Sequence, residues 1–592
     1  MHDTDKSSPS APQSAPGRTA IGLFFTDWSI TAGFLAFLKT FLTGKTLEWL
    51  EERIRRIDPF FKQVFLWIFL TSNAVYLIHT CNILFGNHDF SPLKYGVNIV
   101  LWSGRYANSL PLQILTGGNL TPVLNNLLSL AAMTAASMLL CAFFRLPKLK
   151  RYWIPAGLLP ILLPYASAWF YYAYETVSHS FMPVLAILSI QILREKFTLE
   201  RVMLSVLLIL LALGIYASIL SFFGVILLGL FIQDMINGMT FRAFLQRCLK
   251  LGFVLLSGGI TFKLILFVLK ITGKLSPDLY SLDMPTPAQL IRQIVPETIL
   301  GIRQFFHHTP YIPVPLKLLM LAIIVIGMAA TLSVKTGSPV RETIARKILI
   351  LFFWFGLFFV IMIPDFLTNV NYAFVVRTAY FGTPFLVAVS LMFVFRYANG
   401  VSANFAWFIA FLLLWCSIVS DLEIQKNWKI GFQNELLAYS RVLSMIEQDS
   451  RVAELKKPFN YFQVGALPSG RQPFCRPKIT DGEDSLEFHS FEFNPDWSPR
   501  AGIIFNYLDS GFQTAKSGSF RVDMEMIESC LNLHSPEFQA FIKQAHPYPA
   551  PSSQCLFVDT SSNSIVVVLN QTVLDEFRTQ YGFTPEQPSS VE

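Results

Sequence analysis

VMLSVLLILLALGIYASILSFFGVILLGLFIQ, residues 202–233, is an apolar run of 32 residues that decides the fold of this chain. One helix of that length would cross a bilayer once and two short helices would cross it twice, since about 20 apolar residues span the hydrocarbon core. Gly214, Ser218, Ser221 and Gly224 lie in the middle of the run, and residues of this kind favour a tight hairpin. We therefore predict two helices, at 202–217 and 219–233. A single helix would move every later segment to the opposite side of the membrane.

The whole chain has the composition of a multi-pass α-helical membrane protein. It has 592 residues, of which 53% are hydrophobic and only 14% charged, whereas a soluble domain carries about 25% charged residues. Seven cysteines exclude a disulfide-rich secreted chain. We predict about eleven transmembrane helices, at 63–84, 121–144, 153–170, 180–193, 202–217, 219–233, 251–271, 316–334, 348–364, 380–396 and 405–421.

The charge is distributed unequally along the chain. Residues 1–421 hold 32 Lys and Arg against 18 Asp and Glu, a net charge of 32 − 18 = +14, and residues 422–592 hold 14 against 21, a net charge of −7. The basic residues flank apolar runs, so the expected partner is a membrane surface and not a nucleic acid. With the N-terminus in the cytoplasm, inside segments hold 23 Lys and Arg and outside loops before residue 422 hold eight. This asymmetry follows the positive-inside rule.

Four segments follow from these patterns. Residues 1–19 are rich in Ser, Pro and Ala and are expected to be disordered. Residues 20–62 are predicted to form a cytoplasmic amphipathic, juxtamembrane segment. Residues 63–421 form the predicted transmembrane domain. Residues 422–592 return to a soluble composition and are predicted to be an α+β domain outside the membrane.

The C-terminal domain is expected to contain short strands, helices and one disulfide. The predicted strands are 460–465, 501–508, 555–559 and 564–570, and helices are expected near 432–456, 523–532 and 535–545. On the outer side disulfides can form. We predict a bridge between Cys530 and Cys555, which would close a loop of about 25 residues and contribute roughly 3 kcal/mol. Cys475 is the alternative partner.

The loop after the first span is the first candidate for chemistry. Asp89 follows the span by five residues, so its carboxylate would lie at the membrane surface, where it could deprotonate an acceptor hydroxyl. Arg105 offers a forked cation suited to phosphate, and Lys94 adds a second positive charge. The structural alternatives are that Asp89 caps a helix and that Arg105 anchors the chain at the interface.

Two further outer loops carry polar side chains. In WFYYAYETVSHS, residues 169–180, Tyr172 and Tyr174 could belong to an ordinary aromatic belt, but Glu175 and His179 in so short a loop suggest contacts with a sugar. These four residues are predicted to bind substrate, with Glu175 as the alternative catalytic carboxylate.

The last outer loop supplies the third group. Asp365 and Arg377 bracket an apolar stretch in PDFLTNVNYAFVVRTAY, residues 364–380, and Tyr380 is the last residue of this segment. Arg377 runs against the positive-inside trend and suggests a phosphate partner, although pairing with Asp365 would explain it nearly as well. Asp365 and Tyr380 are predicted to contact the substrate.

The chain resembles the GT-C membrane glycosyltransferases and, more narrowly, the GtrII-type glucosyltransferases that modify O-antigen and convert serotype. The resemblance rests on Asp89 after the first span, Ser-Gly-Arg-Tyr at 103–106, Leu-Gly-Ile-Tyr at 213–216 and Arg377 in the last outer loop. It covers roughly residues 60–420.

The resemblance implies an inverting enzyme of the bacterial inner membrane with residues 422–592 in the periplasm. Such an enzyme takes a hexose, here expected to be glucose, from an undecaprenyl-phosphate sugar and transfers it to a lipid-linked or cell-surface glycan such as O-antigen. Its partners would be this donor, the glycan acceptor and membrane lipids. No cofactor is expected. A single acid, Asp89, follows His88 where many GT-C proteins have two. This departure counts against a metal-dependent mechanism, and a divalent metal stays the alternative.

Two other classes of function compete with the transferase. A flippase or other transporter of lipid-linked sugars should show an inverted repeat or matching broken helices, and the sequence shows neither. A non-catalytic assembly protein of envelope polysaccharide synthesis would place no demand on Asp89. Transfer of a labelled sugar by the wild type and by Asp89→Asn would separate these classes.

Overall fold

The structure is a computed structural model that describes most of the helical body and of the C-terminal sheet. The described residues are 55, 57–82, 104–166, 170, 175–195, 197–275, 292, 296, 312–335, 340–361, 375–398, 400–465, 508, 513–520 and 523–583. The predictions for 1–19 and for most of 20–62 therefore lie outside the described residues.

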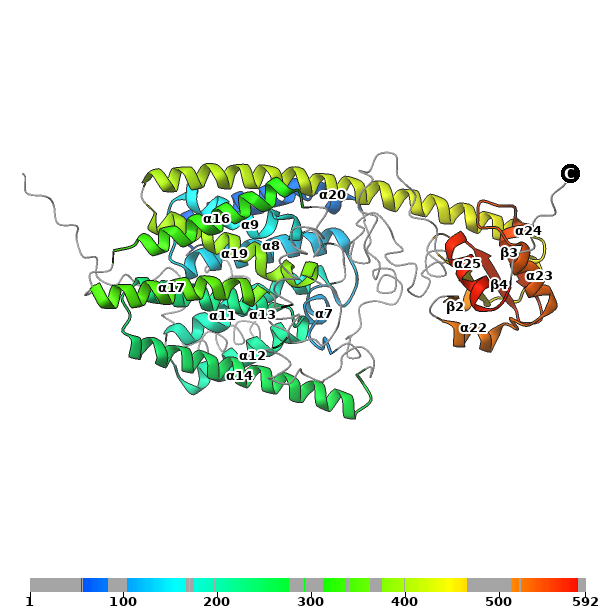
Figure 1. Ribbon diagram of the computed structural model, residues 1–592, viewed down its shortest axis with the longest axis horizontal. Coiled ribbons are helices and arrows are strands. Elements are labelled where there is room, and N and C mark those ends of the chain that lie inside the picture. The colour runs from blue at the N-terminus through cyan, green and yellow to red at the C-terminus, as the bar shows by residue number, and fades with distance from the viewer. Residues whose placement is uncertain are drawn as a thin grey trace, which may run out of the picture.

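The helical body consists of elongated helices that lie side by side (Figure 1). They are α4 (Pro59–Val75), α5 (Leu77–Cys81), α7 (Leu110–Thr116), α8 (Pro122–Phe143), α9 (Lys150–Leu162), η2 (Pro164–Ala166), α11 (Thr176–Glu195), α12 (Leu199–Ile215), α13 (Ile219–Ile236), α14 (Phe241–Ile271), α16 (Val314–Ser333), α17 (Val340–Ile361), α19 (Val375–Tyr397) and α20 (Gly400–Gln448). Each predicted span overlaps a helix, although 63–84 is divided between α4 and α5, and α9 ends at Leu162 within the span predicted at 153–170. Among the described residues, seven helices are long and apolar enough to cross a membrane, namely α8, α11, α13, α14, α16, α17 and α20. The chain is thus a helical membrane protein, and the count of eleven spans stays a prediction.

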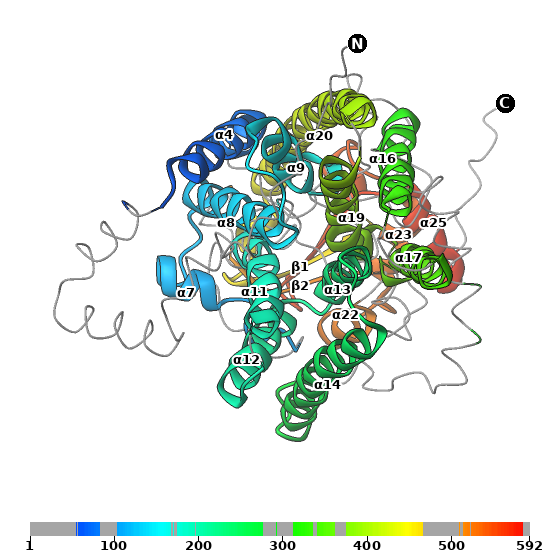
Figure 2. The same cartoon turned by 90° about the vertical axis from the view of Figure 1, so that its left-hand side faces the viewer.

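The run at 202–233 forms two helices, as predicted. The break falls at Tyr216–Ser218, between α12 and α13. Arg194, in the last turn of α11, donates from Nη2 to Gln233 Oε1 at 3.0 Å near the end of α13. Because α12 starts only a few residues after Arg194, this contact shows that α13 returns to the end where α12 began. The end view places α11 beside α12 and α13 beside α17 (Figure 2).

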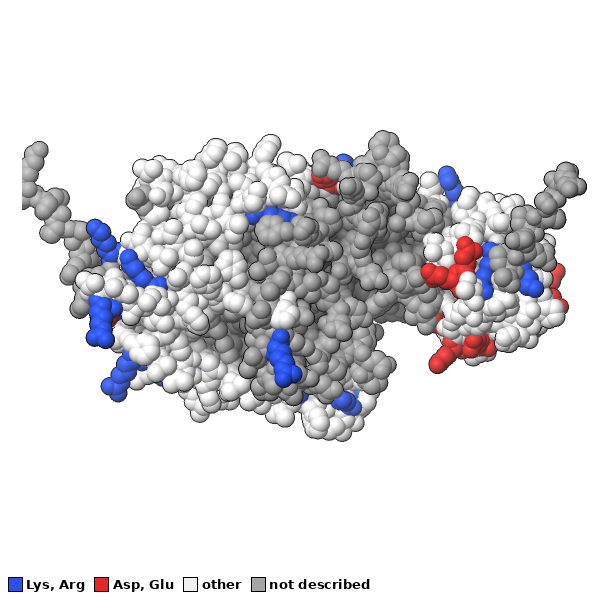
Figure 3. Space-filling model, viewed as in Figure 1, with Lys and Arg blue, Asp and Glu red and all other residues white. Residues whose placement is uncertain are grey.

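Basic side chains gather at one end of the helical body. Lys and Arg gather at the end that faces away from the C-terminal sheet, on the left of Figure 3. The last turn of α11 lies at this basic end, and its first turn lies at the other. With 20 residues, α11 is about 30 Å long at 1.5 Å per residue. That length matches the hydrocarbon core of a bilayer.

Helix α20 joins the body to the C-terminal sheet without a break. It has 49 residues and runs through residue 421, where the sequence predicted the domain boundary (Figure 1). Tyr439, Val442, Leu443 and Ile446 are buried at helical spacing, so its second half is an amphipathic helix that packs on the sheet. The helix predicted near 432–456 is the continuation of the last span.

The C-terminal sheet has four strands in the order β2-β1-β4-β3. They are β1 (Phe459–Val464), β2 (Thr514–Ser519), β3 (Leu556–Asp559) and β4 (Ser564–Val568). β1 pairs in parallel with β2 and β4, and β3 pairs antiparallel with β4. Three predicted strands coincide with β1, β3 and β4. The predicted strand 501–508 lies outside the described residues except for Leu508, and the polar sequence of β2, TAKSGS, gave no strand signal.

Both faces of this sheet are covered. Tyr461, Ile565 and Val567 belong to the same apolar core as the buried residues of α20, whereas Phe462 and Val566 face a second core. The alternation along the strands follows the period of two expected for a sheet packed on both sides. Three helices complete the second layer, α22 (Met524–Cys530), α23 (Pro536–Gln544) and α25 (Gln571–Gln580), and two short helices lie at connections, η3 (Val452–Glu454) and α24 (Ser552–Cys555).

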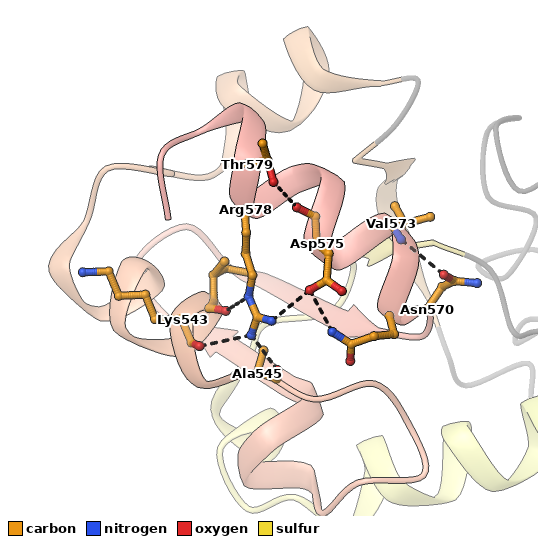
Figure 4. Close-up of polar contacts among 9 residues, drawn as sticks. Lys543, Ala545, Asn570, Val573, Asp575, Arg578 and Thr579 are labelled. Atoms are coloured by element: carbon orange, nitrogen blue, oxygen red, sulfur yellow. Dashed lines mark hydrogen bonds and ion pairs between the residues drawn. The ribbon is translucent and has the colours of Figure 1, made fainter. Parts of the chain in front are cut away.

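A buried arginine ties α25 to α23. Arg578 donates from Nε to the carbonyl of Ile542 at 2.9 Å and from Nη2 to Lys543 O at 3.1 Å and Ala545 O at 2.7 Å (Figure 4). These are carbonyls at the C-terminal end of α23, which have no partner within the helix. The guanidinium also contacts Asp575 at 3.2 Å, so Arg578 acts as a C-terminal cap supplied by another helix.

The predicted disulfide is absent, and this prediction was wrong for the structure. Cys530 and Cys555 are both free thiols. Cys530 ends α22 in the second core, whereas Cys555 Sγ lies 3.3 Å from Met445 Sδ on α20. The two cysteines therefore face different layers of the domain, which sequence spacing alone could not reveal. Cys475 lies outside the described residues.

Candidate active site

The segment 104–108 carries the first side chains of the candidate site. Gly104 has φ +72°, and a Cβ at this position would lie 2.8 Å from Leu266 Cδ2 of α14. Glycine meets both demands because it tolerates the left-handed conformation and has no side chain to collide. The turn at Gly104 thus brings Arg105 close to α14 and the α12–α13 hairpin.

Tyr106 holds this segment on the hairpin. Its hydroxyl donates to Leu210 O at 2.9 Å, and the Ala107 amide donates to Gly214 O at 2.9 Å. A Cβ on Gly214 would lie 2.4 Å from Tyr106 Cε2, so the ring requires glycine there. Burial raises the pKa of Tyr106 to about 12, and the phenol remains a hydrogen-bond donor at any physiological pH.

Glu175 directly precedes α11 and lies in the middle of a polar network. Glu175 as a whole is 2% exposed. Arg105 Nη1 lies 2.7 Å from Glu175 Oε1, and Asn108 Nδ2 donates to the same oxygen at 2.9 Å. Ser178 donates to the backbone carbonyl of Asn108. The carboxylate is therefore charge-paired and hydrogen-bonded, as a buried carboxylate must be.

His179 and Tyr216 complete the group. His179 Nε2 lies 3.5 Å from Glu175 Oε2, one helical turn further along α11. The rings of His179 and Tyr216 have centroids 5.3 Å apart, and the Arg105 guanidinium lies 4.6 Å from the Tyr216 centroid. We name Arg105, Asn108, Glu175, His179 and Tyr216 the Glu175 cluster.

The cluster is suited to holding an anionic, hydroxyl-bearing ligand at the membrane surface. The Arg105 side chain keeps 21% of its surface exposed while one of its nitrogens contacts Glu175. A forked cation in this position can offer hydrogen bonds to a phosphate. Glu175 Oε1 accepts from Arg105 and Asn108, and Oε2 lies 3.5 Å from His179 Nε2, so three side chains of the cluster surround the carboxylate. The geometry favours Glu175 as a positioning residue for Arg105.

The structure brings together three of the predicted site residues, Arg105, Glu175 and His179. Arg377 and Tyr380 lie on the first turns of α19, where their side chains are outside the described part of the structure. The remaining predicted residues, Asp89, Lys94, Tyr172, Tyr174 and Asp365, lie outside the described residues. No group of three metal-ligating side chains occurs among the residues that the structure describes.

Sequence reasoning missed Asn108 as a member of the site. Its side-chain amide contacts a carboxylate 67 residues away, and nothing local in the sequence predicts that contact. The weak signal that was present is its place in RYANSL, three residues after Arg105 and just before the apolar α7.

The sequence of this chain matches a known protein family. The family described as glucosyl transferase GtrII matches residues 85–395, which is more than half of the chain. The chain belongs to this family. It is accordingly a glucosyltransferase built on membrane helices. A search of curated proteins finds no match.

The GtrII match contains every residue of the Glu175 cluster. It begins after α5 and ends within α19, so it also contains the predicted residues Asp89, Lys94, Asp365, Arg377 and Tyr380. Helix α20 and the C-terminal sheet lie beyond the matched region.

Proposed function

We propose that this GtrII glucosyltransferase transfers glucose from a polyprenyl-phosphate sugar to a lipid-linked or cell-surface glycan such as O-antigen, with inversion at the anomeric carbon. The observation that carries the proposal is the pairing of Arg105 with Glu175. It holds a forked cation, partly exposed, at one end of the helical body. A phosphodiester carried on a lipid is the donor chemistry that such a cation fits.

The proposed site lies outside the cytoplasm, at the outer face of a bacterial inner membrane. The Glu175 cluster lies at the first turn of α11, and the basic end of the body lies at its last turn. Under the positive-inside rule the basic end is cytoplasmic. The cluster and the C-terminal sheet are then periplasmic. No nucleotide sugar is expected there, so the donor is lipid-borne.

Asp89 is the proposed general base. An acceptor hydroxyl oxygen attacks the anomeric carbon, the bond from that carbon to the phosphate oxygen breaks, and Asp89 takes the hydroxyl proton. The polyprenyl phosphate leaves with the electron pair of the broken bond. Lys94, Arg105 and Arg377 are proposed to bind the phosphate, which gains negative charge as it leaves.

The substrate sugar is proposed to lie against the aromatic and polar side chains around α11. Tyr172, Tyr174 and Tyr380 supply ring surfaces, and Asp365 and His179 accept or donate hydrogen bonds to sugar hydroxyls. Glu175 orients Arg105 and is the alternative base. No cofactor is required by this scheme, and metal dependence is settled by assay with a chelator.

The decisive experiment measures transfer of labelled glucose from polyprenyl-phosphate glucose to the lipid-linked glycan in membranes that contain the full chain. Asp89→Asn should lower turnover by about 10²–10⁴-fold, the contribution of a general base. Asp575→Asn is the matched control, because Asp575 lies on α25 of the C-terminal domain and its side chain is 56% exposed. Transfer by Asp89→Asn at the wild-type rate, at equal protein levels, would overturn the assignment and make Glu175 the leading base.

The orientation has its own test. A reporter fused after Glu592 should be active in its periplasmic form. The α12–α13 hairpin supports the proposed count of eleven spans, and an odd number of spans with a cytoplasmic N-terminus puts the C-terminus outside. A reporter that is active only in the cytoplasm would overturn the outer location of both the C-terminal domain and the proposed site.

A further inference from the structure

Four arginines from four different elements meet at the basic end of the helical body. Arg145 follows α8, Arg194 lies in the last turn of α11, Arg247 in the second turn of α14, and Arg396 in the last turn of α19. The charges of Arg145, Arg247 and Arg396 all act on the Arg194 guanidinium. We name these four residues the arginine cluster.

Two of the four arginines use neutral partners. Arg194 donates from Nη1 to Phe143 O at 2.7 Å and from Nη2 to Gln233 Oε1 at 3.0 Å. Arg396 donates to Phe144 O. Both therefore cap the C-terminal carbonyls of α8, which explains their position but does not neutralise their full charges.

The cluster is positive even after its surroundings are counted. Asp234 is the one carboxylate, among the described residues, whose charge acts on Arg194, and Arg247 binds both of its oxygens at 2.7 and 2.6 Å. Four arginines and one aspartate give a net charge of 4 − 1 = +3. Four helices, α8, α11, α13 and α19, end nearby, and each C-terminus contributes about half a negative charge. A surplus of about one positive charge remains on this count.

Arg145 adds a second, independent observation. It is exposed and has φ +54°. The Arg145 amide bonds to Ala142 O and the Leu146 amide to Cys141 O, both at 3.0 Å, the arrangement in which a helix usually ends on glycine. A side chain in this left-handed conformation is strained, because its Cβ lies too close to the following carbonyl oxygen. The chain thus keeps a cation where glycine would be relaxed, and such strain points to a functional side chain.

We propose that the arginine cluster binds the phosphate group of an anionic lipid headgroup. Guanidinium forks match phosphate oxygens in geometry and charge. The cluster also lies one α11 length, about 30 Å, from the Glu175 cluster, at the depth of the opposite headgroup layer. The same chemistry could be supplied by free phosphate. This site is separate from the transfer reaction and does not depend on the proposed function.

The test uses the full chain in detergent and three probes of matched concentration. Native mass spectrometry measures binding of short-chain phosphatidylglycerol, phosphatidylcholine with the same chains, and inorganic phosphate. The wild type should bind phosphatidylglycerol more tightly than the other two. Arg145→Gly and Arg145→Gln should each bind it about five-fold more weakly, the factor for about 1 kcal/mol per cation near an anionic surface.

Thermal unfolding without lipid separates binding from folding. Arg145→Gly should unfold at the wild-type temperature or above it because the backbone strain is relieved, whereas Arg145→Gln keeps the strain and loses only the charge. Arg341→Gln is the control. Arg341 is exposed, and its charge is not among those that act on Arg194 or Arg396. Its affinity should be unchanged.

Three results would overturn the proposal. Equal binding of phosphatidylglycerol and phosphatidylcholine would exclude selection of an anionic headgroup, since both lipids carry the same chains and a phosphate but only phosphatidylglycerol has a net negative charge. Wild-type affinity in Arg145→Gly would exclude this cluster. Saturation by inorganic phosphate with no further gain from lipid would reject the lipid headgroup and identify a soluble phosphate as the ligand.

Discussion

The Arg105 guanidinium lies 2.7 Å from the Glu175 carboxylate, although 70 residues separate them in the chain. The Glu175 side chain is 3% exposed and the Arg105 side chain 21%. The pair fastens the segment before α7 to the first turn of α11. It also fixes the one forked cation that the structure describes in the candidate site.

Loss of either partner should destabilise the protein because the other charge stays buried. Arg105→Gln and Glu175→Gln are each expected to cost about 3 kcal/mol, the usual effect of breaking a buried pair. The double variant should cost clearly less than the sum of the two. A double-mutant cycle on detergent-titrated unfolding measures the coupling, and additivity within about 0.5 kcal/mol would show that the pair is not coupled.

Gly214→Ala should displace Tyr106 and, with it, Arg105. The new Cβ would lie 2.4 Å from Tyr106 Cε2, and overpacking of this kind costs about 1–3 kcal/mol. Gly252→Ala in α14 is the matched control, since nothing lies within 4 Å of a Cβ there. It should be neutral or slightly stabilising, because alanine favours a helix. Equal unfolding temperatures and transfer rates for both variants would contradict the role given to Gly214.

The helical body could be predicted from sequence because each apolar run is long and locally bounded. The hairpin at 202–233 was predictable from glycines and serines inside the run. The continuous α20 was not, because charged residues after 421 signal the end of a span but do not end a helix. β2 was missed since its pairing with β1 is decided by the neighbouring strand and not by its polar sequence.

The candidate site was predictable only where a single residue stood out. Arg105, Glu175 and His179 are charged or titratable residues beside apolar spans, so their residue types were informative. Asn108 is an ordinary residue in its local sequence, and Tyr216 stood out only as part of the motif at 213–216. The contacts of both with the site cross long stretches of chain. The predicted disulfide was wrong for the same reason, since the spacing of two cysteines carries no information about which face of the sheet each one occupies.

Arg578→Met should destabilise the C-terminal domain. The substitution leaves the carbonyls of Ile542, Lys543 and Ala545 without the donors that now reach them, and each buried unsatisfied group costs about 1–3 kcal/mol. Asp575→Asn is the control. Its side chain is 56% exposed, and an exposed ion pair contributes at most about 1 kcal/mol. Hydrogen exchange of α23 and α25 in the full chain should accelerate strongly in Arg578→Met and little in Asp575→Asn; equal acceleration would mean that the carbonyl contacts are unimportant.

The thiols of Cys530 and Cys555 should differ sharply in reactivity. Cys555 is fully buried, with Sγ 3.2 Å from the Ala550 carbonyl, and burial raises its pKa to about 11. At pH 8 it is therefore almost entirely protonated, and the thiolate is the reactive form. Cys530 is half-buried at the end of α22, 3.3 Å from Lys516 Nζ.

Maleimide labelling of the native full chain at pH 8, followed by unfolding and a second reagent, should place the first label on Cys530 and the second on Cys555. Peptide mapping without reductant resolves the two from the other cysteines. Cys555→Ala is the deciding variant, because labelling of Cys530 should be the same with and without it. If a disulfide joined the two residues, the substitution would release a new thiol at Cys530, and labelling there would appear only in the variant. That outcome would restore the bridge predicted from the sequence and contradict the separate placement of the two cysteines in the fold.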